Sequence, residues 1–416
     1  MQVNCRKELY MSDGLEAYYG LPAQVKFCRN CVISNQRPCS EVEFEHSPET
    51  KKKAIHFDEE GVCDACRLNE KKDREIDWAE REAELIEVCN QHRRSDGRYD
   101  CIVPGSGGKD SVLASWLLKY KYGMHPLTVA WSPHLFTPHG WNNFSNWIHE
   151  GGFDNVLFTP NGKVCRILTR LSLQKLFHPF QPFILGQKNI GARYALMYDV
   201  PLVFYGENEA EYGNPIQDTV SALRSARFHA GANHMQMRIG GVRVEDLINE
   251  HGLSMNDVAC YLPLEPEQVE AKKIEVHYMG YYVRWDPQEA FYFAVEKTKF
   301  VPNDRRTEGT FSKYNSIDDK TDPIHYWTIL LKFGIGRASY EASQEIRNRK
   351  ITRDEGVALV KKFDQEFPER YFPEFLEYVG MTRGEFSDLA DRFRSPHLWV
   401  NNHGSWSLRH NVWQES

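Results

Sequence analysis

The sequence predicts an α/β protein: a doubly wound parallel sheet, preceded by a zinc ribbon and followed by a mainly helical C-terminal region. Three observations favour this class. A loop of small residues, 104–111, directly follows the apolar run 99–103; apolar runs alternate with helical patterns up to residue 206; and two Cys-x-x-C pairs lie near the N-terminus. We divide the chain into a ribbon region (1–68), a linker helix (69–95), an α/β domain (96–265) and a C-terminal region (266–416).

Composition narrows the class of function. The formal net charge is −7 over 416 residues, which gives no sign of a general affinity for nucleic acid or anionic membranes. No run of residues approaches the length of a membrane span, and the first twenty residues lack an apolar signal segment. We therefore expect a cytoplasmic protein. Ten cysteines in a chain of this length are too few for a disulfide scaffold.

The two cysteine pairs, Cys28 with Cys31 and Cys63 with Cys66, have the spacing of a zinc ribbon. Four thiolates close a tetrahedral coordination sphere and leave no position for a catalytic water, so the zinc is expected to be structural. An iron–sulfur cluster on the same cysteines is the open alternative. Other potential ligands between the pairs are Cys39, His46 and His56.

After the charged linker, the chain alternates strands and helices. The strands are expected at 99–103, 126–131, 155–159 and 201–206, with a helix over 184–198 before the last of them. Further helices are expected at 353–367 and 383–393. Ligands of such sheets bind beyond the carboxyl ends of the strands, so the loop after Val103 is the first place to look for a site.

This loop has the properties of a phosphate cradle. Glycines let successive N–H groups converge on an anion, and the following helix adds the positive end of its dipole. Asp110 after Gly-Lys excludes a Walker A loop and makes this carboxylate a plausible Mg²⁺ ligand beside bound ATP. The expected ATP-binding residues, including the end of the second strand, are Ser106, Gly107, Gly108, Lys109, Asp110, Ser111, Ala130 and Trp131.

An acidic run, 206–214, follows the last of these strands. Such a run is usually a solvated loop, but its position at the sheet edge favours Glu207 or Glu211 as a second metal ligand or as a handle for an amine. Lys188 opens the preceding helix and could reach a phosphate oxygen. The expected catalytic set is therefore Asp110, Lys188, Glu207 and Glu211.

The string Ser-Gly-Gly-x-Asp-Ser over 106–111 resembles the PP-loop of the N-type ATP pyrophosphatases, which include GMP, NAD and asparagine synthetases. Across most of the chain, the zinc pairs and the segments 159–163, 178–189, 205–208, 332–337 and 345–347 resemble the N-acetyl sugar amidotransferases of bacterial surface-polysaccharide (lipopolysaccharide O-antigen or nonulosonic acid) biosynthesis. The resemblance implies a PP-loop, adenine nucleotide α-hydrolase-like fold that uses ATP, Mg²⁺ and a structural Zn²⁺.

The implied reaction converts an acetamido group of a nucleotide-activated sugar, such as a UDP-diacetamido uronic acid, into an acetamidino group. ATP adenylates the amide oxygen, and ammonia displaces AMP. The implied partners are a class I glutaminase resembling that of imidazole glycerol phosphate synthase and a cyclase-like protein; a homodimer is also possible. An aromatic and basic C-terminal region would hold the sugar nucleotide, and the expected substrate-binding residues are Asn208, Arg305, Lys332 and Arg337.

One property of the residues agrees with a separate glutaminase. Cys5 is not next to Met1, and no cysteine stands in a Gly-x-Cys-x-Gly setting, so a glutaminase nucleophile is not visible. Two other functions fit the sequence less well. A PP-loop tRNA thiolase is disfavoured by the acidic charge and by the lack of a Lys/Arg-rich strip. A non-catalytic nucleotide-binding scaffold is mildly disfavoured by the presence of Asp110 and the acidic run.

Overall fold

The computed structural model describes residues 11–12, 14–206, 208, 211, 213–214 and 221–414. Its centre is a five-stranded sheet in the order β5-β4-β3-β6-β9, in which every pair of neighbours is parallel. This confirms the expected α/β class. The strands are β3 (Cys101–Pro104), β4 (Pro126–Trp131), β5 (Asp154–Phe158), β6 (Leu202–Tyr205) and β9 (Glu275–Tyr278).

The strand order contains one reversal of direction. From β3 the chain moves outward to β4 and β5, and it then returns to place β6 on the other side of β3. Connections that leave in opposite directions open a crevice at the carboxyl ends of the two strands between which the order reverses. The loop after β3 lies at this switch point, where the sequence placed the phosphate cradle.

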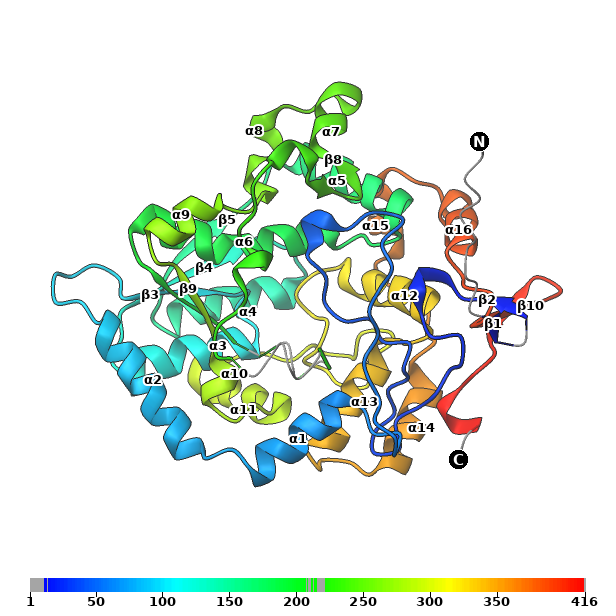
Figure 1. The fold of residues 1–416 in the computed structure, drawn as a ribbon, viewed down its shortest axis with the longest axis horizontal. Helices are drawn as coiled ribbons and strands as arrows, with labels where there is room; N and C mark the ends of the chain where they lie inside the picture. Colours follow the sequence, from blue (N-terminus) through cyan, green and yellow to red (C-terminus); the bar gives the residue numbers. More distant parts are fainter. Residues whose placement is uncertain are drawn as a thin grey trace, which may run out of the picture.

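Both faces of the sheet are buried. Successive residues of a strand point to opposite sides, and residues of both sets lie in hydrophobic cores. Ile102 and Val203 belong to a core that includes Leu185 and Ile190 of α6. Val103 and Phe204 belong to a second core with residues of α2, α3 and α10. Helices therefore cover both faces, as in a doubly wound sheet, and Figure 1 shows the sheet with α2, α3 and α10 gathered beside it.

Sixteen α-helices are present among the described residues. They are α1 (Asp64–Arg74), α2 (Trp78–His92), α3 (Lys109–Trp116), α4 (Pro138–His149), α5 (Gly162–Leu176), α6 (Gln181–Tyr198), α7 (Val244–His251), α8 (Met255–Val258), α9 (Pro266–Ala271), α10 (Met279–Tyr282), α11 (Pro287–Thr298), α12 (Asp322–Phe333), α13 (Arg337–Arg347), α14 (Arg353–Phe363), α15 (Phe372–Val379) and α16 (Arg383–Arg392). Three short antiparallel hairpins complete the regular structure: β1 (Met11–Ser12) with β2 (Leu15–Glu16), β7 (Arg238–Ile239) with β8 (Val242–Arg243), and β10 (Trp399–Asn402) with β11 (Ser405–Leu408).

The linker differs from the single solvated helix expected over 69–95. It forms two helices, because Asp77 accepts hydrogen bonds from the backbone N–H groups of Ala79 and Glu80 and so begins α2 anew. The preceding helix, α1, already starts at Asp64, inside the region assigned to the ribbon. It is also partly buried: Lys72 is 3% exposed and its Nζ lies 2.5 Å from Glu211 Oε1.

The sheet also reaches past the expected end of its domain. β9 begins at Glu275, after residue 265, and pairs with β6 along its whole length. A strand at the sheet edge with the sequence Glu-Val-His-Tyr lacks the apolar run that identified the four earlier strands. The other domain limits given above stay predictions.

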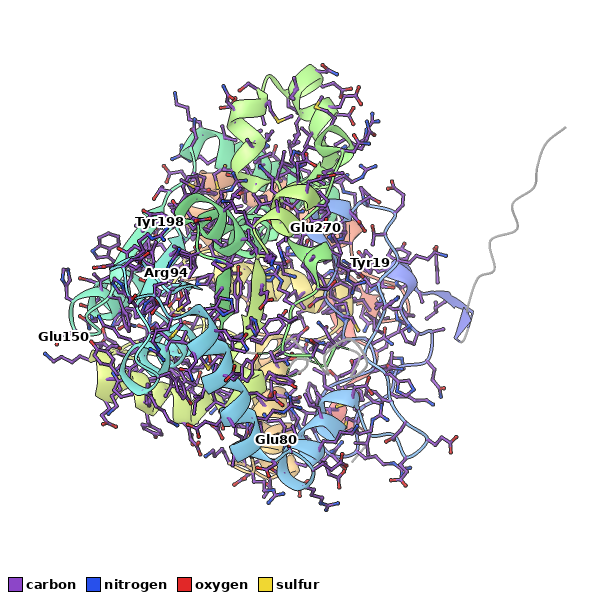
Figure 2. All side chains as sticks on the ribbon, turned by 60° about the vertical axis from the view of Figure 1, so that its left-hand side comes forward. Tyr19, Glu80, Arg94, Glu150, Tyr198 and Glu270 are labelled. Atoms are coloured by element: carbon purple, nitrogen blue, oxygen red, sulfur yellow. The ribbon has the colours of Figure 1, made fainter. Side chains whose placement is uncertain are left out.

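The C-terminal region is mainly helical, as expected. Residues of α12, α15 and α16 share one core with Leu173 and Phe177 at the end of α5. The N-terminal segment packs on this region as well: the Tyr19 hydroxyl donates to the Phe393 carbonyl oxygen at 2.6 Å. In Figure 2, Tyr19 lies on the opposite side of the molecule from Glu150 at the end of α4. None of the helices in the described part of the chain has the length and apolarity that a bilayer crossing requires.

Candidate functional site

The loop between β3 and α3 makes a tight turn that passes directly against α4. Gly107 has φ +80°, and a Cβ there would lie 2.8 Å from Phe144 Cα, so a side chain is excluded by conformation and by space. Gly108, at φ −71° and ψ 167°, is in ordinary extended backbone. The Ser111 hydroxyl donates to the Gly108 carbonyl oxygen at 2.9 Å and fixes the first turn of α3. The helix thus begins where an anion would sit.

The end of β6 closes in on the same loop. A Cβ on Gly206 would meet Asp110 Cβ and the Asp110 carbonyl oxygen at 3.0 Å each. Both Asp110 carboxylate oxygens have partners: Trp285 Nε1 donates to Oδ1 at 2.7 Å, and Lys109 Nζ lies 2.6 Å from Oδ2. Asp110 is therefore held at the loop in a fixed orientation. Sequence reasoning assigned no role at the loop to Trp285, because it lies 175 residues further along the chain.

A cavity of about 220 Å³, here called the loop cavity, opens beside this loop. One wall is the loop itself, and another is the α6 face at Phe183 and Gln187. The remaining wall comes from the C-terminal region. Its residues are Tyr314, Asn315, Ser316, Ile317, Asp318, Asp319, Asp322 and Arg337, with Phe300 nearby.

Asp318 is the carboxylate of this wall in direct contact with the loop. The Ser106 hydroxyl donates to Asp318 Oδ2 at 2.8 Å. Burial raises the pKa of Asp318 to about 6; the charges of Asp322 and Asp319 act in the same direction, and the Ser106 hydrogen bond and the Lys109 ammonium oppose it. Burial also raises the pKa of Asp322. The acidic group Asp318, Asp319 and Asp322 is visible in the sequence, but no motif connects it to the loop.

Asp319 has a structural role. It is buried, accepts hydrogen bonds from the backbone N–H groups of His134 at 2.6 Å and Leu135 at 3.3 Å, and bonds to Thr321. These bonds fasten the loop after β4 to the 317–321 segment. The same segment pairs with the start of α4, where the Thr137 N–H donates to the Asp318 carbonyl oxygen at 3.0 Å. The C-terminal wall is thereby anchored to the sheet domain.

The expected catalytic residues separate into different surroundings. Asp110 lies at the loop cavity. Glu211 is turned inward, where it pairs with Lys72, and lines a different cavity of about 280 Å³ together with Asn208. Lys188 lies with its Nζ 4.9 Å from the centre of the Phe228 ring and does not line the loop cavity. Glu207 lies outside the described residues.

Two of the expected ATP-binding residues, Ala130 and Trp131 at the end of β4, are in the core. Trp131 is 5% exposed, its ring centre lies 5.0 Å from that of Phe158 and 5.2 Å from that of Tyr261, and Gly186 passes directly against it. Ala130 is equally buried. Only backbone groups of these two residues can therefore reach a nucleotide; their side chains stabilise the packing of α6 on β4.

The expected substrate cations are also divided. Arg337 lines the loop cavity, bonds to the Tyr326 hydroxyl, and has its Nε 3.3 Å from Glu341 Oε1. Lys332 is buried instead: its Nζ donates to the Leu176 carbonyl oxygen at 2.9 Å, and burial lowers its pKa to about 7. Arg305 is exposed and does not line the loop cavity.

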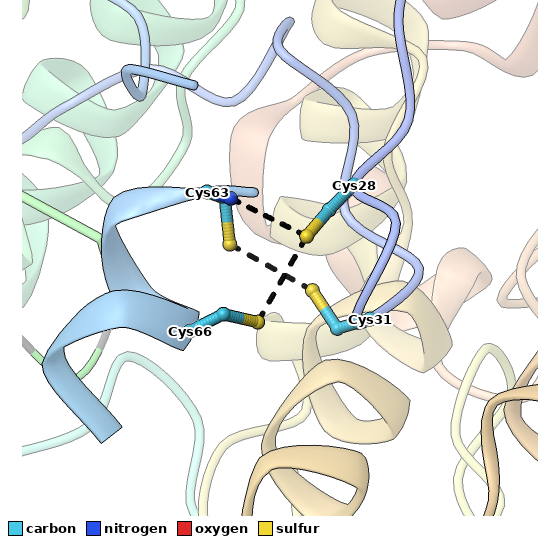
Figure 3. A group of neighbouring side chains, drawn as sticks. All are labelled: Cys28, Cys31, Cys63 and Cys66. Atoms are coloured by element: carbon cyan, nitrogen blue, oxygen red, sulfur yellow. Dashed lines mark hydrogen bonds between the residues drawn. The ribbon is translucent and has the colours of Figure 1, made fainter. Parts of the chain in front are cut away.

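The four cysteines of the ribbon meet as expected (Figure 3). Four thiolates about 2.3 Å from a tetrahedral zinc stand about 3.8 Å from one another. The Cys28–Cys66 and Cys31–Cys63 Sγ distances are 3.9 and 3.8 Å, and all four residues are buried. The donor set thus fits a structural zinc and could hold one.

The alternative ribbon ligands do not take part. The Cys39 thiol points to the Gly213 carbonyl oxygen at 4.0 Å, His46 lies beside Glu43, and the exposed His56 lies beside Asp64. The ribbon is tied to the C-terminal region, because Arg353 of α14 donates to the carbonyl oxygens of Cys28 and Cys31 at 3.4 and 3.3 Å.

A comparison with known protein families identifies the C-terminal region. Residues 308–412 match the family described as "LPS biosynthesis protein WbpG-like, C-terminal domain". The chain therefore carries a domain of a lipopolysaccharide (LPS) biosynthesis family, which supports a role in LPS biosynthesis. The C-terminal wall of the loop cavity, from Tyr314 to Arg337, falls within the matched range.

A second similarity covers a shorter stretch. An uncharacterized protein of Methanocaldococcus jannaschii is 37% identical over 84 residues. The match covers 20% of this chain and 29% of that protein, so this chain spans less than a third of the relative's length.

Proposed function

We propose that this chain is an ATP-dependent, AMP-forming amidotransferase of LPS biosynthesis. Its substrate is a nucleotide-activated sugar of the UDP-diacetamido uronic acid type, and its product carries an acetamidino group in place of an acetamido group. The observation that supports this most is the loop cavity. There, a phosphate-type loop at the switch point of a parallel sheet faces residues of an LPS-biosynthesis domain.

The loop residues bind the phosphates of ATP. N–H groups of Gly107, Gly108 and the first turn of α3 surround the anion, and Lys109 adds a positive charge at the rim. Arg337 faces the same space from the other wall and orients the carboxylate of the uronic acid. Because both walls belong to one cavity, the two substrates meet within it.

The reaction has two displacements. The amide oxygen of the acetamido group attacks the α-phosphorus, forming a P–O bond while the bond to pyrophosphate breaks. Ammonia then attacks the activated carbon, loses a proton, and expels AMP as the C–O bond breaks. Asp318 is the proton acceptor in this account, because its position at the loop and a pKa of about 6 leave it ionised at neutral pH and still basic enough to take a proton.

Magnesium fits the donors of the cavity. Mg²⁺ is usually held by one or two carboxylates together with substrate phosphates and water. In the described part of the chain, the cysteine cluster is the only assembled group of three or more ligand atoms, so a magnesium site here would need the phosphates of ATP to complete it. Asp110 is the protein ligand we assign, and the ion would neutralise charge on the departing pyrophosphate.

The nitrogen source follows from the resemblance given above. We propose that a separate glutaminase subunit delivers ammonia, with a cyclase-like partner in the assembly. The purified chain alone should then use ammonium salts at high concentration and leave glutamine intact. Adding the glutaminase should confer glutamine-dependent activity.

The test is a product assay with a UDP-diacetamido uronic acid, ATP, Mg²⁺ and ammonium. We expect AMP, pyrophosphate and a sugar lighter by about one mass unit to appear in equal amounts by mass spectrometry. Cys260→Ser, in the short 3-10 helix η8 (Ala259–Tyr261) and not among the residues that line the loop cavity, is a control that should keep full activity. Release of ADP and phosphate, or hydrolysis of glutamine by the chain alone, would overturn the proposal.

A further inference from the structure

A further cavity, here called the arginine cavity, lies at the carboxyl ends of β6 and β9. Its volume is about 350 Å³, and Arg224, Arg227, Phe228, Lys53 and Tyr278 are among its lining residues. Tyr278 is the last residue of β9. The segment at Arg224 runs along the outer side of this strand, because the Arg224 N–H donates to the Val276 carbonyl oxygen at 2.7 Å. Ligands of parallel sheets bind at this edge.

Arg224 is the unusual residue of this cavity. It is 6% exposed, and its two terminal nitrogens donate to the carbonyl oxygens of Lys188 at 3.2 Å and Phe228 at 3.3 Å. Its Nε is buried without a hydrogen-bond partner. Within the described residues, no carboxylate lies within salt-bridge distance of this guanidinium. A buried guanidinium is stabilised by an anion, so Arg224 is suited to bind an anionic group of a ligand.

The other cations of the cavity are at its rim. Arg227 and Lys53 are exposed, and among the described residues neither forms a salt bridge. The Arg227 guanidinium carbon lies 4.8 Å from the centre of the Phe228 ring, and that of Arg224 lies 5.7 Å from the same centre. Glu41 and Glu45 also line this cavity. The cavity therefore has three cations and two carboxylates, which leaves an excess positive charge. This charge lies near the Phe228 ring, which both Arg224 and Arg227 contact.

Two consecutive residues of α6 connect Arg224 with the lining of the loop cavity. The Tyr205 hydroxyl donates to the Gln187 carbonyl oxygen at 2.8 Å, and the Arg224 guanidinium donates to the carbonyl oxygen of the next residue, Lys188. Gln187 lines the loop cavity. One ligand bound at Arg224 could therefore extend past α6 to the phosphate loop.

We propose that the arginine cavity binds the diphosphate of the sugar nucleotide, with Arg224 and Arg227 as its ligands and the acetamido group reaching the loop cavity. The inference rests on the proposed function for the identity of the substrate. Planar guanidinium groups make paired, charge-assisted hydrogen bonds to phosphate oxygens, and a diphosphate supplies such an anion. The alternative source of the same chemistry is the triphosphate of ATP.

Calorimetric titration of the full chain with UDP and, separately, with ATP and Mg²⁺ distinguishes the two sources. Arg227→Ala changes an exposed side chain and leaves folding intact. Arg224→Lys keeps the positive charge but removes the planar guanidinium group that can make paired hydrogen bonds. We expect each variant to weaken UDP binding by about tenfold or more and to leave ATP binding unchanged within about twofold. Arg74→Ala, which removes an exposed arginine of α1, should change neither affinity.

Three results would overturn this assignment. They are a wild-type chain that does not bind UDP at millimolar concentration, UDP affinity that is unchanged in Arg227→Ala, and loss of ATP affinity in place of UDP affinity. Thermal unfolding of each variant excludes misfolding as the cause. The titration needs no turnover, so an arginine-dependent UDP site would stand even if the chain released no AMP, and the two proposals can fail independently.

Discussion

Two adjacent glycines of the loop between β3 and α3 differ in backbone conformation and in the space around them. Gly107 has φ +80° and touches the backbone of α4, whereas Gly108 has φ −71° and its nearest neighbour for a Cβ is the Ser106 hydroxyl at 3.3 Å. The sequence alone treats both as cradle glycines. The structure makes only Gly107 conformationally irreplaceable, because residues with a Cβ rarely adopt its φ.

We therefore expect Gly107→Ala to lower ATP affinity by at least about a hundredfold, and Gly108→Ala by about tenfold or less. The reason is that the first change displaces the loop amides and the second leaves them in place. Titration with ATP and Mg²⁺ checks this, with thermal unfolding as the folding control. Equal losses in the two variants would contradict the loop geometry.

Asp318 carries a prediction about pH. Its pKa of about 6 is above that of an ordinary carboxyl, because burial and the charges of Asp322 and Asp319 outweigh the Ser106 hydrogen bond and the Lys109 charge. The proton-accepting carboxylate then forms as pH rises through about 6. At constant free ammonia, kcat should rise about tenfold per pH unit below that value and level off above it.

Asp318→Asn should abolish this rise of kcat with pH and lower kcat by roughly a hundredfold. Total ammonium must be adjusted at each pH, because the fraction of free ammonia changes with pH. Asp319→Asn is an unsuitable control, since Asp319 fastens the loop after β4. Asp304→Asn, which changes a side chain that is 93% exposed, is suitable and should keep the pH dependence below 6. An unchanged pH profile in Asp318→Asn would remove the base from the mechanism.

At the scale of elements, the cysteine ribbon does not line the loop cavity, but it packs on the C-terminal helices. Ile335, at the start of the α13 region, packs in the cysteine core, and Arg353 of α14 bonds to the carbonyl oxygens of both residues of the first cysteine pair. Loss of the metal should therefore weaken the C-terminal wall of the loop cavity without removing the loop itself.

Cys28→Ser should abolish stoichiometric zinc and lower Tm by about 5 °C or more, because one of four thiolates is lost and metal binding contributes to folding. Cys89→Ser, a buried cysteine of α2 outside the cluster, is the matched control and should keep its zinc. Metal analysis and a thermal scan measure both effects. Iron with a visible charge-transfer band in the wild type would overturn the zinc assignment.

The elements also show what sequence reasoning can reach. Strands β3 to β6 were expected to within two residues at each end, because each is an apolar run that ends in a turn or loop. β9 was missed, because an edge strand with charged and polar residues resembles a loop. The linker was expected as one helix, because the capping role of Asp77 was not recognised.

Burial limited the prediction of site residues. Lys332, Glu211 and Trp131 are residue types that serve in binding sites, but tertiary contacts turn all three inward. Asp318 and Trp285, by contrast, reach the loop from more than 170 residues away in sequence. The cysteine cluster is predictable because its ligands stand in pairs of fixed spacing. The position of the loop after β3 is predictable for a similar reason, whereas its role in binding phosphate stays a prediction.

At the scale of the whole molecule, the sheet domain supplies the loop between β3 and α3, and the region that matches the LPS-biosynthesis family supplies the facing wall of the loop cavity. The central claim is that the acetamido oxygen is transferred to AMP. The most direct measurement uses a UDP-diacetamido sugar labelled with ¹⁸O in its acetamido carbonyl groups, incubated with ATP, Mg²⁺ and ammonium. Mass spectrometry should find one ¹⁸O in the phosphate of AMP for each acetamidino group formed and none in pyrophosphate. Unlabelled AMP alongside an aminated product would contradict the account.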